Sequence, residues 1–314
     1  MAPTLTSARV AVVSGKGGVG KTTVAAALAV AAARTGKQVL LAEIEDRRAL
    51  APMFGIPEVG YVERALGPNL AGIEVEADDA LVEYLQHFYG IPRLSRALVK
   101  SKVVDFATNT APGLRDILLI GKIKESEQRR PRGVYAYDLI VIDAPPTGRL
   151  PRFLDAPRAV AALVRSGPIK RQAEGVLDMV RDPKRLQVIL VTQPEEMPAR
   201  ETAEAVETLG KMDIALGPIV INGVWKEMRA LGKDPYASLR AAAADAGLGL
   251  GEEAIKALAD VSSVHARRAR NQRKVITELK REVDLPQVTL PFLFNERMAR
   301  PELDVLATQL EGAL

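Results

Sequence analysis

The sequence contains no cysteine and only two histidines, His87 and His265, among its 314 residues. A chain without cysteine can form no disulfide bond, no thiolate metal site and no cysteine nucleophile. Two histidines without any cysteine also make a zinc site unexpected. The composition therefore predicts a protein that works without zinc and without thiol chemistry.

Long apolar runs are missing as well. No uncharged stretch approaches the ~20 residues that a membrane-spanning helix needs, and no secretory signal is visible before the first apolar strand. We therefore expect a cytoplasmic location. The hydrophobic content of 47% and the charged content of 26% are ordinary for a globular protein with a large core.

The chain also has few aromatic residues and only a small excess of positive charge. The chain has 43 lysines and arginines against 39 acidic residues, a net charge of +4, and aromatic residues make up only 4%. The basic cluster at 267–274 contains no aromatic residue, so stacking on single-stranded nucleic acid has no support. These features predict no nucleic-acid partner.

What the sequence does contain is a glycine-rich stretch, Gly15–Thr23, that fits the phosphate-loop pattern G-x-x-x-x-G-K-[ST]. The apolar run Val10–Val13 before it predicts a buried strand. The alanine-rich run Val24–Arg34 after it predicts a helix that Gly36 ends. Strand, glycine turn and helix in this order are the context that a phosphate loop requires, so we predict that the loop binds a nucleotide.

The chemistry of the loop assigns a role to each part of it. Its backbone amides and the positive end of the following helix hold phosphate oxygens. Lys21 can reach the β- and γ-phosphates, and the Thr22 hydroxyl can bind Mg²⁺. The predicted nucleotide-binding residues of the loop are Gly15, Gly17, Gly18, Val19, Gly20, Lys21, Thr22 and Thr23.

Two further apolar runs end in acidic residues. Residues 38–45 predict a strand that carries Glu43 and Glu45, and residues 138–143 predict a strand that ends in Asp143. Ligands of open α/β sheets lie at the carboxyl ends of the strands, so we expect these acids near the phosphates. Asp143 is the predicted second ligand of Mg²⁺, beside the loop threonine.

The lysine directly after the first loop glycine, Lys16, resembles the extra lysine of the signature-lysine (deviant Walker A) ATPases. Later segments resemble, in order, motifs of the ArsA-like family, which includes the arsenite-pump ATPase and the ATPase that targets tail-anchored membrane proteins. Asp143–Arg149 is similar to its D-T-A-P-T-G-H switch and departs from it at Ala144, Pro145 and Arg149. The other similar segments are Ala111–Gly113, Val191–Met197, Ile219–Asn222 and Val288–Phe292.

The resemblance implies an ATPase that binds ATP and Mg²⁺ and works as a dimer. In such a dimer Lys16 of one subunit reaches the nucleotide of its partner. Family members usually carry a water-positioning aspartate at the position where this chain has Glu45. In this chain the neighbouring Asp46 is the alternative residue for that role. The resemblance also implies that Asn222 and Pro291 contact the adenine base. The catalytic residues implied in this way are Lys16, Lys21 and Glu45.

The resemblance further implies a membrane-associated client. The lack of cysteine excludes the usual metalloid site and a zinc-clasped dimer. Met179 is the only methionine between Arg149 and Lys184, which weakens the case for a methionine-rich groove for tail anchors. What remains resembles bacterial ArsA-like ATPases of actinobacterial type, working as a homodimer or as a heterodimer with a related subunit.

We therefore expect a single α/β domain over residues 1–314, built on a doubly wound, mostly parallel sheet, with helical insertions at about 60–135 and 150–185. Its expected function is an ATP-switched ATPase in the cytoplasm or peripheral to the membrane. Two alternatives stay open: a positioning ATPase of the ParA/MinD type, and a slow or inactive ATP-binding scaffold, which is favoured if Glu45 cannot replace aspartate.

Several local elements are also predicted. Residues Gly72–Glu76 predict a short edge strand, and Asp79–Tyr89 and Glu252–Arg281 predict helices. The basic amphipathic stretch Arg93–Val104 is expected either as a solvated helix face or as a contact with anionic membrane or a partner helix.

Overall fold

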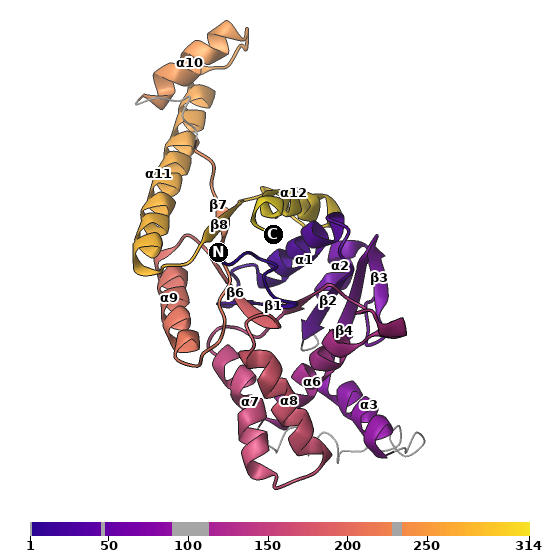
Figure 1. Cartoon of the computed structure of the whole chain (residues 1–314). Coiled ribbons are helices and arrows are strands. Elements are labelled where there is room, and N and C mark those ends of the chain that lie inside the picture. Colours follow the sequence, from indigo (N-terminus) through magenta and orange to yellow (C-terminus); the bar gives the residue numbers. More distant parts are fainter. Residues whose placement is uncertain (1, 45–47, 90–112, 228–233) are drawn as a thin grey trace.

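The computed structural model describes residues 2–44, 48–89, 113–227 and 234–314, and it contains an eight-stranded sheet with helices on both faces (Figure 1). The strand order is β3-β4-β2-β5-β1-β6-β7-β8. Neighbouring strands are parallel except for β3, which runs antiparallel to β4. The predicted doubly wound, mostly parallel sheet is thus confirmed. The strands are β1 (Val10–Gly15), β2 (Val39–Ile44), β3 (Arg64–Gly67), β4 (Leu70–Val75), β5 (Leu139–Asp143), β6 (Leu186–Thr192), β7 (Ile219–Val224) and β8 (Gln287–Pro291).

The central strands are apolar because both faces of the sheet are covered. Strands β1, β2, β5 and β6 are buried along their whole lengths, as parallel strands between two helical layers must be. The prediction of an edge strand at Gly72–Glu76 was wrong, since β4 lies between β2 and β3. The edge is β3, whose first two residues, Arg64 and Ala65, are exposed.

The helices form a layer on each side of the sheet. Helix α1 and α12 pack in the core of one face, and α6, α7, α8 and α9 contribute to the core of the other. Eleven residues of α1 are buried, so this helix is enclosed on all sides, and its alanine-rich sequence suits that position. The described helices are α1 (Lys21–Arg34), α2 (Leu50–Phe54), α3 (Ala77–Tyr89), α6 (Leu114–Gln128), α7 (Leu150–Leu163), α8 (Pro168–Arg181), α9 (Glu196–Gly210), α10 (Pro235–Asp245), α11 (Glu252–Glu282) and α12 (Arg300–Leu310).

The longest helix, α11, agrees with the predicted helix at Glu252–Arg281. Near its carboxyl end, Val275 and Leu279 pack with Ile219 of β7 and Ala199 of α9. Its other half carries α10 and projects beyond the sheet (Figure 1). The sequence did not predict this projection, because the charge pattern of the helix says nothing about where the helix attaches.

Some predicted features lie outside the described residues. These are Glu45, Asp46 and the basic stretch Arg93–Val104. Among the helices that the structure does describe, none combines the length and the apolar composition that crossing a bilayer requires.

Candidate nucleotide site

The glycine-rich loop connects the end of β1 to the start of α1, and two of its glycines are required by the local geometry. Gly20 has φ +91° and caps α1 in the left-handed region, and a Cβ there would lie 2.3 Å from Asn222 Nδ2. A Cβ on Gly15 would lie 2.1 Å from the carbonyl oxygen of Val191 in β6. The tight loop leads directly into the first turn of α1, whose leading backbone amides have no acceptor within the helix, and this is the arrangement that binds anions.

The two side chains after the loop have well-defined partners. Lys21 is only 7% exposed, and its Nζ donates to the carbonyl oxygen of Lys16, 3.1 Å away. The Thr22 hydroxyl donates to Asp143 Oδ2 at 2.5 Å. Asp143 is fully buried at the end of β5, where it is the register partner of Val13 in the adjacent β1. A hydroxyl and a carboxylate oxygen side by side are the ligand types that Mg²⁺ prefers, so these residues fit the ion.

The turn that follows Asp143 is hydrogen-bonded to the loop. The backbone N–H of Thr147 donates to the carbonyl oxygen of Gly15 at 3.1 Å. The Ser14 hydroxyl donates to the carbonyl oxygen of Pro145 at 2.6 Å. The segment that resembles a nucleotide switch is therefore in direct contact with the candidate phosphate site.

The end of this segment also contacts the helical layer. Arg149 Nη2 donates to Asp116 Oδ1 at 2.9 Å, and the Asp116 side chain on α6 is only 9% exposed. A charged hydrogen bond to a buried carboxylate is among the stronger contacts in proteins. This contact joins the end of the turn at 143–149 to α6.

Asn222 and Pro291, the predicted base contacts, lie at the ends of neighbouring strands. Asn222 Nδ2 donates to the carbonyl oxygen of Val19 at 2.9 Å, so this side chain holds the loop itself. Pro291 ends β8 and is the register partner of Val224 in β7. The structure thus brings Asn222 to the loop, while contact of either residue with adenine stays a prediction.

The sequence analysis missed an aromatic cluster beside these strand ends. The Trp225 ring lies 5.4 Å from Phe292 and 4.8 Å from His265 between ring centroids. Arg268 of α11 stacks over Trp225 at 4.6 Å. Phe292 remains 41% exposed, which leaves an aromatic surface next to Pro291. No sequence signal links these residues, because they come from three separate segments.

Glu43 lies beside Asp143, its register partner in the adjacent β5, and its carboxylate is bonded to the start of α2. Its carboxylate is buried and accepts the backbone N–H groups of Ala49 and Leu50 at 3.0 and 3.2 Å. Burial raises the pKa of Glu43, the two hydrogen bonds lower it, and the neighbouring Asp143 and Glu74 raise it further. Glu43 therefore anchors the start of α2 from a position beside Asp143.

Lys16 is bound within its own chain. Its Nζ donates to Glu201 Oε1 on α9, and both side chains are about one-third exposed, at 37% and 34%. Exposed ion pairs of this kind contribute about 0–1 kcal/mol. The contact therefore holds Lys16 only weakly, and a stronger anion could displace Glu201.

Comparison with known proteins adds an independent line of evidence. A sequence model described as anion-transporting ATPase matches residues 8–171 and 167–233. The ATPase BagA of Mycobacterium tuberculosis is 42% identical over 224 residues, which cover 69% of this chain and 66% of BagA. The arsenical pump-driving ATPases of Acidiphilium multivorum and Escherichia coli are 25% and 24% identical, and each alignment covers 69% of this chain and 40% of the relative.

The matches cover only part of the relatives and only part of this chain. The chain spans slightly less than two thirds of BagA and less than half of the two pump-driving relatives. The match to the family model includes the loop, Asp143 and Asn222 but ends at residue 233, before Pro291.

From the environment of Glu43 we predict that the free energies of unfolding of the wild type and of Glu43→Gln differ by an amount that depends on pH. Because the folded-state pKa is raised above the ordinary value of 4.5, the buried carboxyl contributes most below that pH and loses this contribution as pH rises through the folded pKa. Glu43→Gln should therefore gain stability relative to the wild type between pH 5 and pH 8, measured by urea unfolding. Glu204→Gln, which removes an exposed carboxylate from α9, controls for the loss of one negative charge. A difference that stays constant or reverses sign would contradict the assignment.

Proposed function

From the premise that the chain belongs to the anion-transporting ATPase family, we propose that it binds ATP with Mg²⁺ at Gly15–Thr23 and hydrolyses it. The observation that carries the proposal is the hydrogen bond of 2.5 Å between Thr22 and Asp143. It joins the two oxygen ligands that a nucleotide-bound Mg²⁺ requires, directly after a loop whose bend depends on Gly15 and Gly20.

Each residue of the site has a proposed role. The backbone amides of the loop, including those of Val19 and Thr23, bind the phosphates. Lys21 stabilises the negative charge that develops on the phosphates. Thr22 and Asp143 hold Mg²⁺, which when bound supplies positive charge to the phosphate oxygens. The remaining assignments are Glu45 as the residue that positions the attacking water, and Asn222 and Pro291 as contacts to the base.

The proposed active form is a dimer, of two identical chains or of this chain with a related subunit. Lys16 would leave Glu201 and reach the phosphates bound by the partner. The low free energy of an exposed ion pair makes this exchange inexpensive. ATP would thereby select one dimer shape, and loss of the γ-phosphate would release it.

The proposed outcome of the cycle is transport or targeting of a membrane-associated client, from the cytoplasm or the membrane surface. The contacts of the turn at 143–149 support such coupling. One end of the turn is bonded to the loop through Thr147, and the other end is bonded to α6 through Arg149 and Asp116. A change at the phosphates would move the helical layer through this turn.

A slow or inactive ATP-binding scaffold is the second candidate. It is favoured by the glutamate at position 45, because an added methylene shifts the carboxylate and misplacement of about 1 Å can reduce a rate strongly. A positioning ATPase of the ParA/MinD type is the third candidate. It has less support, because the family model and the named relatives are anion-transporting and arsenical pump-driving ATPases.

Replacing the loop lysine tests nucleotide binding. Lys21→Ala should weaken ATP binding about 100-fold, because a charge-assisted hydrogen bond to phosphate is lost. The measurement is titration of the purified protein with MgATP by calorimetry. Lys211→Ala, which removes an exposed lysine from α9, should leave the affinity unchanged. An ATP affinity that survives Lys21→Ala would remove the nucleotide-site proposal.

Lys16 tests the dimer. Lys16→Ala should leave ATP affinity within about threefold and lower kcat about 100-fold, the usual effect of losing one donor to developing charge. Glu201→Ala should not lower kcat, because it only frees Lys16. If the lysine acts across the interface, mixing Lys16→Ala with Lys21→Ala subunits should restore turnover at the sites that combine an intact Lys21 with the partner's intact lysine. Mixtures as inactive as the parents would refute a role across the interface.

Steady-state turnover distinguishes an ATPase from a scaffold. We expect measurable wild-type hydrolysis and a loss of about 100-fold or more in Glu45→Gln, since positioned acids and bases typically contribute at least that factor. Glu45→Asp should retain or raise the rate. A wild type without turnover that becomes active in Glu45→Asp would instead support the scaffold.

A further inference from the structure

A second cavity lies in the helical layer, away from the nucleotide site. It has a volume of about 730 Å³ and lies between α3, α6 and α8. None of its lining residues belongs to the loop or to the turn at 143–149. The volume is in the range of about 300–1,000 Å³ that is typical of pockets for small molecules.

One side of this cavity is an apolar wall. On α6, Leu114 and Leu118 lie one turn apart and line the cavity. The α3 side adds Leu81 and Leu85, and α8 adds Ile169. Such a wall buries an apolar chain favourably, by about 25 cal/mol for each Å² removed from water.

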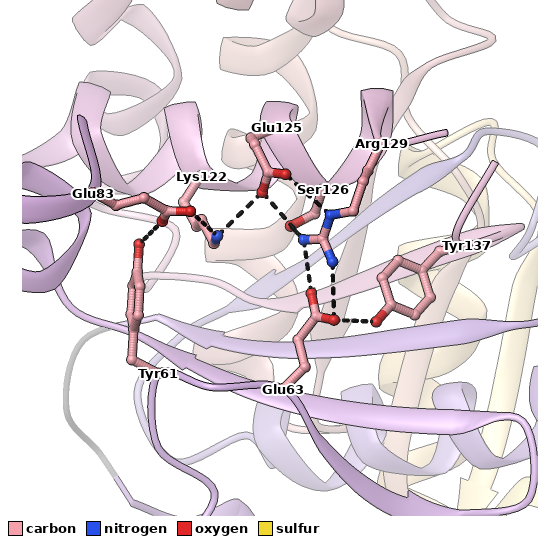
Figure 2. A network of polar contacts seen from close by, with 8 residues as sticks. All are labelled: Tyr61, Glu63, Glu83, Lys122, Glu125, Ser126, Arg129 and Tyr137. Atoms are coloured by element: carbon pink, nitrogen blue, oxygen red, sulfur yellow. Dashed lines mark hydrogen bonds and ion pairs between the residues drawn. The ribbon is translucent and has the colours of Figure 1, made fainter. Parts of the chain in front are cut away.

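In a polar network at one end of the cavity, the positively charged side chains are already paired with carboxylates (Figure 2). Lys122 contacts Glu83 at 2.8 Å and Glu125 at 3.1 Å. Arg129 contacts Glu125 at 3.0 Å and Glu63 at 2.8 Å. Both cations therefore have two carboxylate partners, and this end offers no unmatched positive charge to a ligand.

Lys124 differs from these two cations. It lines the same cavity, and in the described part of the chain no carboxylate lies within ion-pair distance of its Nζ. Its described partner is Gln172 Oε1 on α8, at 3.4 Å. Burial and the nearby Arg185 lower the pKa of Lys124, while Asp178 and Glu127 oppose this effect. A half-buried ammonium group without a counter-ion is costly, so an anion would be favoured beside it.

The position of Lys124 is built into the packing of α6 on α8. A Cβ on Gly175 would lie 2.4 Å from Lys124 Nζ and 2.9 Å from its Cε. A Cβ on Gly121 would lie 3.0 Å from Gln172 Nε2. The two glycines thus make the space in which the ammonium and amide groups sit at the cavity.

We propose that this cavity binds a single-chain carboxylic acid, with its carboxylate at Lys124 and Gln172 and its alkyl chain along the apolar wall. Among the described cations of the lining, Lys124 alone has no carboxylate at ion-pair distance, which suits a singly charged headgroup. The apolar wall suits one unbranched chain. The volume of the cavity is too small for a membrane-spanning helix of ~20 residues. The proposal does not depend on ATP binding, because the two sites share no residue.

The test is calorimetric titration of the full chain with sodium dodecanoate, without nucleotide and below its micelle concentration. Lys124→Gln should weaken binding about tenfold or more, because a charge-assisted hydrogen bond is lost, while Lys124→Arg should retain it. Leu85→Asp, which puts a negative charge on the wall, should also weaken binding. Lys170→Gln, which changes a lysine of α8 outside the cavity lining, is the matched control and should bind as the wild type does.

Ligand variants separate the headgroup from the chain. Dodecyltrimethylammonium, with the same chain and the opposite charge, should bind at least tenfold more weakly than dodecanoate. Tighter binding of dodecyl phosphate would replace the carboxylate assignment by a phosphate. No dodecanoate binding to the wild type would overturn the proposal. Equal binding by the wild type and Lys124→Gln would overturn it as well.

Discussion

The hydrogen bond between Thr22 and Asp143 is the contact on which the candidate site depends. It forms because β1 and β5 are neighbours in the sheet, so that the first turn of α1 lies beside the end of β5. The fully buried carboxylate is held where water cannot compete for it. Any arrangement of strands that separated β1 from β5 would part the Thr22 hydroxyl from the Asp143 carboxylate.

The loop is also constrained by β6 and β7, which follow β1 in the sheet on the side away from β5. Asn222 of β7 donates to the Val19 carbonyl and fills the space that a side chain at Gly20 would need. Strand β6 fills the corresponding space at Gly15. The bend of the loop is therefore set by two neighbouring strands, β6 and β7. Such a preorganised cradle favours anion binding because little must be ordered when the ligand arrives.

Helix α6 relates the candidate nucleotide site to the second cavity. Asp116, in its first turn, binds Arg149 after the turn at 143–149, while Leu118 and Lys124 further along the helix line the cavity. A rigid helix moves as one body, so the same displacement would be felt at both places. The bond to the turn at 143–149 and part of the cavity lining therefore lie on the same helix.

The sequence alone determined the sheet class, the loop and the strand that ends in Asp143, because each is specified by neighbouring residues. Glycine positions, apolar runs and helical periodicity are all signals carried by residues that lie within one helix, strand or turn. Tertiary structure decided which distant groups meet: Thr22 and Asp143 are 121 positions apart, Lys16 and Glu201 185, and Val19 and Asn222 203. It also decided that Glu43 anchors α2, that α11 projects and that Lys124 meets Gln172 rather than a carboxylate of the described residues. These outcomes depend on how elements pack, and no local pattern encodes packing between segments so far apart.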